Sequence, residues 1–370
     1  MNPTNAAPLR ITFVLPMFLA APSGGFKVVY EYANRLHRRG HIVTVVHPRT
    51  LDLQGSANGW RDLVKSYLWA WKLRWQHRPL IGWFRLDPGV RVRLVRDLRE
   101  SLLPDADVIV ATAFQTAFPV AGYGGRKGRG YYLIQSYEDW MGEETRVRES
   151  WQLPLRKIVV SRWLERRAHE LGEGARTVRI PPGLDRDQFR VLRPAATRQR
   201  PRVGPRVGML AHPLAIKGTA DGVAALEQVR QRIPALEAVL FGTTPRPADL
   251  PEWIEYEQSP SPAALVDLYN SCQVFLHPSH LEGWGLPAVE AMACGCALAA
   301  AHNEGVDDFA EDGVTALVVP IRAPERLAEA VERLLTEEAL RHRLAAAGRE
   351  RVAQFDWSAT VDLMEETLRA

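Results

Sequence analysis

The chain alternates short apolar runs with segments in which apolar residues recur every three to four positions. Residues 10–16 and 41–48 are apolar runs of the length of a buried strand. Between them, one helical face carries Val29, Tyr32, Ala33 and Leu36, and Gly40 ends this segment. A strand, a helix and a second strand in this order predict a parallel sheet.

The same alternation continues along the rest of the chain, apart from residues 190–207, which are rich in proline and arginine and are expected to link two domains. Further strands are expected at residues 106–112, 129–135, 156–161, 206–211, 236–242, 253–257, 273–279, 296–301 and 315–320. Further helices are expected at residues 219–231, 262–270, 287–294, 323–336 and 337–353. The pattern predicts an α/β protein of two doubly wound, Rossmann-like domains that face each other and bind a ligand in the cleft at the carboxyl ends of their strands.

Composition narrows the class of protein. The 370 residues are enough for two domains, and 46% of them are hydrophobic. The net charge of +4 comes mainly from arginine and suits phosphate or an anionic surface, but the excess is too small to predict a nucleic-acid partner.

The three cysteines, Cys272, Cys294 and Cys296, are expected to be buried thiols in a reducing cytoplasm. The apolar start resembles a secretion signal, but Pro16 interrupts it and a helix follows, so we expect a cytoplasmic protein.

The most informative stretch is HPSHLEGWGLPAVEAMACG, residues 277–295. It places Glu282 on a loop after a strand and Glu290 in the first turn of the helix that follows. Pro287 suits the first position of that helix, and Gly295 its end.

The loop and the helix start have the properties of a phosphate site. Gly283 and Gly285 allow the backbone to approach a ligand closely, and a helix N-terminus presents unpaired N–H groups. Glu282 and Glu290 are then placed to accept hydrogen bonds from hydroxyl groups on either side of the phosphate. The alternative is that Glu290 only complements the helix dipole and Glu282 is a solvated loop charge.

Residues 278–295 resemble the donor-site signature of glycosyltransferase family 4, whose members are retaining enzymes of GT-B fold. Residues 179–189 resemble the family's motif at the end of its first domain, and residues 303–320 resemble the segment after the glutamate pair. The resemblance covers most of the chain. It implies an acceptor-side domain at residues 1–190 and a nucleotide-sugar-binding domain at 202–355, with a final helix at 356–370 that crosses back to the first domain.

The resemblance assigns roles to the donor-site residues. It implies that Glu282 contacts the hydroxyls of the donor sugar and that Glu290 contacts the ribose of the nucleotide. Backbone amides near Gly285 and Leu286 would hold the diphosphate or the sugar.

Lys217 follows a strand and precedes a helix, so it is placed to neutralise the diphosphate. Family members usually carry an arginine five residues before this lysine, where this chain has His212. Two alternatives are open: either His212 is neutral and donates one hydrogen bond, or another arginine fills the position.

Gly24 and Gly25 follow the first strand and open a helix. They form either an ordinary turn or a loop that cradles a phosphate, and the resemblance favours the phosphate loop.

The acceptor side is expected to involve Gln135, Tyr137 and Glu138, because the loops at residues 111–118 and 133–140 lack the histidine that many family members have there. The run YYLIQSYEDW resembles a Gln-x-Tyr-Glu pattern of some bacterial rhamnosyltransferases of the family. Glu138 either orients or deprotonates an acceptor hydroxyl, or pairs with a nearby arginine.

The implied reaction transfers a hexosyl or deoxyhexosyl group with retention at the anomeric carbon. The expected substrates are a nucleotide-diphosphate sugar and a saccharide or lipid-linked acceptor. No metal or other cofactor is expected, because positive side chains and helix dipoles stabilise the charge on the leaving diphosphate. The leaving phosphate itself is able to take the acceptor's proton.

Residues 60–84 hold five of the eleven tryptophans, among basic residues. Tryptophan and arginine together favour a membrane interface, which would suit a lipid-linked acceptor at the inner face of the membrane and a role in surface polysaccharide or glycolipid synthesis. The alternatives are a helix packed on the first domain or an aromatic lining for the acceptor.

Two rival functions are a protein that binds a nucleotide sugar without turnover and a peripheral membrane module. Phosphorolysis is disfavoured because no pyridoxal site is evident.

Overall fold

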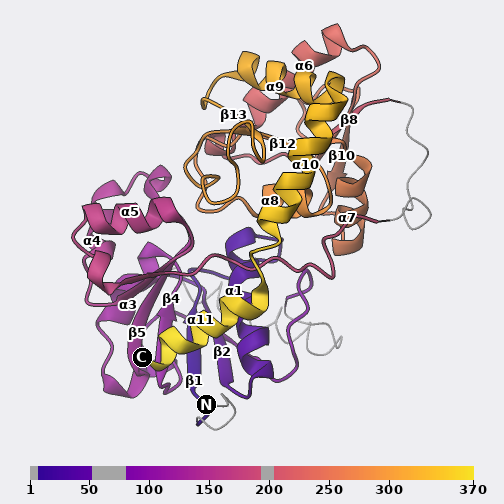
Figure 1. Cartoon of the computed structure of the whole chain (residues 1–370). Helices are drawn as coiled ribbons and strands as arrows, with labels where there is room; N and C mark the ends of the chain where they lie inside the picture. The colour runs from indigo at the N-terminus through magenta and orange to yellow at the C-terminus, as the bar shows by residue number, and fades with distance from the viewer. Residues whose placement is uncertain (1–6, 52–80, 193–203) are drawn as a thin grey trace. The chain divides into compact units, whose positions relative to one another are not determined.

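The computed structural model (Figure 1) describes residues 7–51, 81–192 and 204–370. The chain forms two α/β units. The N-terminal unit consists of Met1–Val160, Leu164–Ile180 and Val361–Ala370, and the C-terminal unit consists of Ser161–Trp163 and Pro181–Thr360.

The described part of the N-terminal unit holds a parallel sheet in the order β3-β2-β1-β4-β5-β6-β7. Its strands are β1 (Arg10–Val14), β2 (Ile42–Pro48), β3 (Arg91–Val95), β4 (Val108–Ala111), β5 (Arg129–Ile134), β6 (Arg156–Val159) and β7 (Thr177–Arg179). The associated helices are α1 (Gly24–Arg38), α3 (Phe114–Ala121), α4 (Glu144–Trp151), α5 (Arg162–Glu170) and α11 (Trp357–Arg369).

The C-terminal unit has a second parallel sheet, in the order β10-β9-β8-β11-β12-β13. Its strands are β8 (Arg206–Leu210), β9 (Glu237–Gly242), β10 (Ile254–Gln258), β11 (Val274–His277), β12 (Ala297–Ala301) and β13 (Leu317–Val319). Its helices are α6 (Thr219–Arg232), α7 (Pro262–Ser271), α8 (Leu286–Ala293), α9 (Pro324–Thr336) and α10 (Glu338–Val352).

In both sheets the strand order reverses beside the first strand of the unit. β1 lies between β2 and β4, and β8 lies between β9 and β11. Loops that leave the carboxyl ends of strands at such a switch point diverge and leave room for a ligand. In the C-terminal unit these are the loops after β8 and β11, which contain Lys217 and Glu282.

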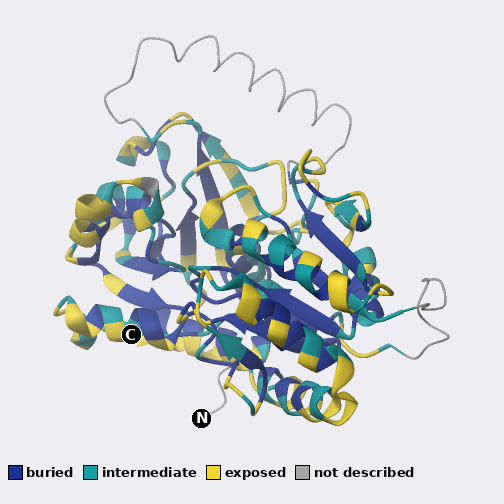
Figure 2. Cartoon of the chain, turned by 90° about the horizontal axis from the view of Figure 1, so that it is seen from above, coloured by how far each residue is buried: buried dark blue, intermediate teal, exposed yellow. Residues whose placement is uncertain are grey.

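The apolar periodicity of the sequence corresponds to burial. Figure 2 shows the inner strands of both sheets mostly in the buried class, and exposed residues on the helices and loops. The predicted inner face of α1 is fully buried, at 0% exposure for Val29, Tyr32, Ala33 and Leu36. All five residues of β12 are buried, which explains why it reads as an unbroken apolar run.

Two segments differ from the sequence-based expectation. Residues 181–190 were expected in the first domain but cluster with the C-terminal unit, because Leu184 N–H donates to the carbonyl of Phe355 over 2.7 Å. Residues 111–118 were interpreted as a loop, but α3 begins at Phe114. The Thr116 hydroxyl, which lies inside the helix, accepts from the N–H groups of Thr112 and Ala113 and so stabilises the helix N-terminus.

The final helix crosses back to the N-terminal unit, where residues 361–370 cluster. Glu365 forms an ion pair with Arg39, and the Tyr131 hydroxyl donates to the carbonyl of Thr367 over 2.8 Å. These contacts attach α11 to the C-terminal end of α1 and to β5.

The tryptophan-rich segment at residues 60–84 lies outside the described residues, except for its last four. Of these, Trp83 and Phe84 pack on Tyr30, and the indole N–H of Trp83 donates to the carbonyl of Leu19 over 3.1 Å. Within the described ranges, no helix is both long and apolar enough to cross a membrane.

His47, at the end of β2, is a buried neutral residue that the sequence did not single out. Its ring is 0% exposed, packs near Phe18, Phe26 and Tyr30, and donates through Nδ1 to the carbonyl of Met17 over 2.9 Å. Burial lowers the pKa of His47 to about 4.

Acid is therefore expected to destabilise the N-terminal unit through His47. The unfolded chain binds a proton at this histidine below its ordinary pKa of about 6.5, whereas the folded chain does not until about pH 4. The contribution of neutral His47 to the free energy of unfolding is fully present above pH 6.5 and is lost as the pH falls toward 4. Between pH 7 and pH 5, the wild type should lose about 2 kcal/mol of unfolding free energy more than His47→Gln, as measured by urea unfolding. Parallel losses in the two proteins would contradict a buried neutral His47.

Candidate active site

Two loops of the C-terminal unit meet at the switch point of its sheet. The loop after β8 contains a short 3-10 turn, Ala215–Lys217, and the loop after β11 contains Glu282. His280 N–H donates to the carbonyl of Ile216 over 2.7 Å. Gly218, at φ +63°, lies so close to the Pro278 carbonyl that a Cβ at this position would be 2.1 Å from the oxygen. The glycine is required both by the left-handed backbone and by this contact.

Lys217 and Glu282, which are 65 residues apart, form an ion pair at this junction. Lys217 Nζ lies 2.8 Å from Glu282 Oε2, and the Ser279 hydroxyl donates to Glu282 Oε1 over 2.9 Å. Burial alone would raise the pKa of Glu282, but the Lys217 ammonium, His277 and the Ser279 hydroxyl together outweigh burial and hold the pKa below its usual value. Glu282 is 9% exposed, so the alternative that it is a solvated loop charge is wrong.

Glu290 is buried in α8, one turn beyond the helix N-terminus. The helix begins at Leu286 after Gly285, which caps it at φ +96°, so Glu290 is the fifth helical residue and not part of the first turn as predicted. It is 6% exposed, and the Tyr269 hydroxyl donates to its Oε2 over 3.2 Å. A buried carboxylate held by a tyrosine does more than complement a helix dipole from the surface.

His212 has a defined tautomer. Leu214 N–H donates to His212 Nδ1 over 3.1 Å, which leaves the ring proton on Nε2. Burial, and then the charge of Lys217, lower the pKa of His212, so the imidazole is neutral at physiological pH. This geometry fits the first of the two alternatives, a neutral histidine with one hydrogen bond to give.

Three buried polar groups around the Glu282 loop were not identified as candidates from the sequence. His277 Nε2, Trp284 Nε1 and Asn303 Oδ1 are buried and have no hydrogen-bond partner among the described residues. In the sequence, His277 lies at the end of a predicted strand and Asn303 at the start of a segment that resembles the family. Their proximity to Glu282 depends on the fold; for instance, Asn303 Nδ2 donates to the carbonyl of Ser279 over 3.0 Å.

Gly305 fixes the position of the Glu282 backbone. A Cβ at residue 305 would lie 2.5 Å from the Glu282 carbonyl oxygen and 2.9 Å from its Cβ. Gly305→Ala is therefore expected to displace the loop and to lower the free energy of unfolding by about 1–3 kcal/mol, as measured by urea titration. Gly125→Ala is the matched control, because nothing lies within 4 Å of a Cβ there. Equal stability of the two variants would show that the loop has room at Gly305.

In the N-terminal unit, the glycine turn and Gln135 lie together. Gly24 and Gly25 open α1 after β1, and Gln135 Nε2 donates to the carbonyl of Gly25 over 3.1 Å. A Cβ at Gly25 would be 3.3 Å from this nitrogen. This hydrogen bond attaches the turn to the end of β5, the strand that Gln135 follows.

The other two acceptor-side candidates have separate environments. Glu138 Oε2 accepts from the N–H of Phe114, the first residue of α3, over 2.9 Å, so its observed partner is a helix N-terminus and not an arginine. Burial raises the pKa of Glu138 to about 7. Tyr137 is buried beside Trp151, with the Arg167 guanidinium 4.8 Å from its ring centre, which indicates a packing role.

Both halves of the chain match known families. Residues 22–188 match the family described as Glycosyltransferase Family 4, and residues 217–351 match Glycosyl transferases group 1. Both matches are to glycosyltransferases, and they support the resemblance to glycosyltransferase family 4.

Curated glycosyltransferases share parts of this sequence. It is 42% identical to D-inositol 3-phosphate glycosyltransferase of Frankia alni over 104 residues, which cover 28% of this chain and 26% of that protein. It is 30% identical to GDP-mannose-dependent alpha-(1-6)-phosphatidylinositol monomannoside mannosyltransferase of Mycobacterium tuberculosis over 224 residues, which cover 55% and 58% of the two chains. The chain therefore spans between about a quarter and three fifths of the length of these two relatives.

Solved structures confirm the GT-B fold. HepE of Anabaena, in complex with UDP and glucose, matches with a TM-score of 0.71 at 17% identity, over 98% of this chain and 99% of that chain. Sucrose-phosphate synthase of Thermosynechococcus elongatus matches with a TM-score of 0.71 at 19% identity, over 97% and 98% of the two chains.

Proposed function

We propose that this glycosyltransferase is a retaining enzyme that moves a sugar from a nucleotide-diphosphate donor to a saccharide or lipid-linked acceptor. The observation that carries the proposal is the Lys217–Glu282 ion pair beside the N-terminus of α8, with Glu290 buried one turn further along. The names of the relatives support it, because one uses GDP-mannose and HepE binds UDP-glucose.

The proposed donor site consists of three charged side chains and a helix N-terminus. The diphosphate lies against the N–H groups at Gly285 and Leu286, where the helix dipole favours negative charge. When the donor binds, the Lys217 ammonium moves from Glu282 to the diphosphate. Hydroxyl groups of the sugar then donate to Glu282 in its place. Glu290 accepts from the ribose hydroxyls, with the flexible backbone of Gly283 and Gly285 allowing close approach.

Catalysis then follows from stabilising the leaving group. Lys217 and the N-terminus of α8 stabilise the charge that develops on the diphosphate, and the Nε2–H of His212 donates a further hydrogen bond. No metal is needed for this step. The acceptor's proton passes to the leaving phosphate oxygen or to Glu138, whose pKa of about 7 suits proton transfer near neutral pH.

The acceptor side comprises the Gly24–Gly25 turn, Gln135 and Glu138 of the N-terminal unit. A lipid-linked acceptor would place the enzyme at the inner face of the cytoplasmic membrane, in bacterial surface polysaccharide or glycolipid synthesis. The relatives that act on phosphatidylinositol mannoside and inositol phosphate support an acceptor of this chemistry.

Turnover tests the proposal. UDP-glucose or GDP-mannose is incubated with the protein and with inositol 3-phosphate or phosphatidylinositol, and nucleotide release and the anomeric proton of the product are followed. Because both donors are α-linked, retention predicts an α-linked product. A β-linked product would overturn the retaining mechanism. Donor binding without release from any pair would instead favour a nucleotide-sugar-binding protein.

A further inference from the structure

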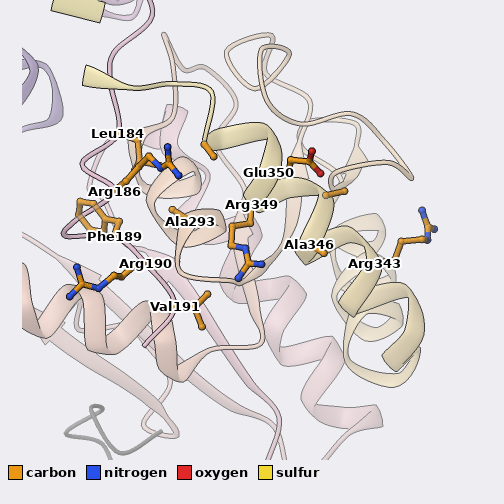
Figure 3. Close-up of a pocket in the computed structure, with 12 residues that line it drawn as sticks. Leu184, Arg186, Phe189, Arg190, Val191, Ala293, Arg343, Ala346, Arg349 and Glu350 are labelled. Atoms are coloured by element: carbon orange, nitrogen blue, oxygen red, sulfur yellow. The ribbon is translucent and has the colours of Figure 1, made fainter. Parts of the chain in front are cut away.

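The C-terminal unit contains a cavity that shares no lining residue with the candidate active site. Its volume is about 830 Å³, and it lies between residues 184–191, the C-terminal end of α8 and one face of α10 (Figure 3). Neither the proposed reaction nor the family resemblance assigns it a role.

Helix α10 divides its residues between the core and this cavity. One of its faces is buried, through Leu344, Gly348 and Val352 at intervals of four. The lining residues on the cavity side recur at helical spacing and are Arg343, Ala346, Ala347, Arg349 and Glu350. The small alanines leave the space open between the longer charged side chains.

The cavity carries an excess of positive charge. Arg186, Arg190, Arg343 and Arg349 line it together with a single carboxylate, Glu350. Arginine is charged at every physiological pH, so the lining has a net charge of +3.

Two of the arginines have no side-chain partner among the described residues. In the described part of the chain, neither Arg186 nor Arg349 forms a side-chain hydrogen bond or ion pair, although Glu350 is next to Arg349 in sequence. Arg190 donates to the carbonyl of Asp187, and Arg343 donates to the carbonyl of Gly313. In Figure 3, Arg186 and Arg349 lie on either side of Ala293, whereas Arg343 points away from the other lining side chains.

The remaining wall is apolar. Leu184, Phe189 and Ala293 are buried beneath the cavity, and Val191 is 48% exposed beside them. An inorganic anion would use the arginines but leave this apolar surface in water. A ligand with both a phosphate and an apolar body uses both parts of the lining.

The cavity also borders two segments that lie near boundaries of the C-terminal unit. Residues 184–191 follow the boundary at Pro181, and Ala353 precedes the boundary at Val361. Two hydrogen bonds join the segments: Leu184 N–H donates to the carbonyl of Phe355, and the Thr360 hydroxyl donates to that of Pro181. A ligand held here therefore contacts both segments at once.

We propose that this cavity binds an organic phosphate, with the phosphate group held by Arg186 and Arg349 and the apolar body against Phe189 and Val191. Two guanidinium forks match the tetrahedral oxygens of a phosphate and bind it with charge-assisted hydrogen bonds. The phosphate is supplied either by a soluble compound or by the headgroup of a phospholipid.

Calorimetric titration with two soluble probes tests the site itself. The probes are dihexanoylphosphatidic acid below its micelle concentration and glycerol 3-phosphate, which lacks the apolar body. We expect the first to bind at least tenfold more tightly, and Arg186→Gln/Arg349→Gln to weaken its binding at least tenfold. The matched control, Arg326→Gln/Arg333→Gln, removes two exposed arginine charges from α9 and should bind as the wild type does. Equal weakening in both double variants, or no binding to the wild type, would overturn the proposal.

Vesicles distinguish the source of the phosphate. Cosedimentation with phosphatidylglycerol–phosphatidylcholine vesicles that is lost in Arg186→Gln/Arg349→Gln, but kept in the α9 control, assigns the site to a membrane headgroup. Binding of the soluble probe without vesicle binding assigns it to a soluble phosphate. The calorimetric titration and the vesicle assay are repeated with Glu290→Ala. Because the cavity is separate from the donor site, this variant should bind the probes and the vesicles as the wild type does. Failure of the donor-site proposal therefore leaves the cavity proposal testable.

Discussion

Replacing Lys217 with alanine is expected to lower kcat/KM for the nucleotide-sugar donor by about 10²–10³-fold. Lys217 is the ammonium nearest the proposed diphosphate position, and the neutral His212 beside it does not replace its charge. The variant should also lose about 3 kcal/mol of unfolding free energy, because the buried Glu282 carboxylate is left without its ion-pair partner. Steady-state kinetics and urea unfolding measure the two effects separately.

A second variant separates the loss of charge from the loss of structure. Lys217→Met/Glu282→Gln removes both charges, so it should regain most of the stability that Lys217→Ala loses but none of the activity. If this double variant were active, or if Lys217→Ala kept wild-type kcat/KM, the proposed role of Lys217 at the diphosphate would be wrong.

Trp284→Ala is expected to produce the largest loss of stability, about 3–5 kcal/mol. The indole is 4% exposed and packs edge-on against Phe309 and Phe355, at ring distances of 5.8 and 4.8 Å. It anchors the loop between Glu282 and α8, so donor affinity should fall as well. Urea unfolding and nucleotide titration of the same variant give both values.

The conservative variant Trp284→Phe shows whether packing is the cause. The indole Nε1 is buried without a hydrogen-bond partner, so losing this N–H group removes no hydrogen bond. Trp284→Phe should therefore cost only about 1 kcal/mol, from the smaller ring. A loss as large as that of alanine would mean that the indole N–H, and not the ring, stabilises the loop.

Much of the fold was predictable because parallel strands covered on both faces are continuous apolar runs. The expected strand at 296–301 and helix at 219–231 correspond to β12 and α6 within a residue or two. Helix α3 was missed because part of its N-terminus is satisfied by Glu138, 24 residues further along the chain. Short-range patterns carry no information about such a partner.

The candidate site was predictable only as separate motifs. The loop of Glu282 and the lysine at position 217 were recognisable from a family signature, but their ion pair depends on the order β8-β11 in the sheet. The buried Nε2 of His277 and the arginines at positions 186 and 349 have no signature of their own. Their environments arise from tertiary packing, which a linear pattern does not show.

The most direct test of the central claim is thermal unfolding of the protein with UDP, GDP, dTDP, ADP or CMP. At about 100 times its dissociation constant, the right nucleotide should add about 2.7 kcal/mol to the stability of the unit that binds it. That gain should be lost in Glu290→Ala and kept in Glu338→Ala, which removes an exposed glutamate from α10. Stabilisation by no nucleotide, or by one that acts equally on Glu290→Ala, would contradict a nucleotide-sugar site at Lys217, Glu282 and Glu290.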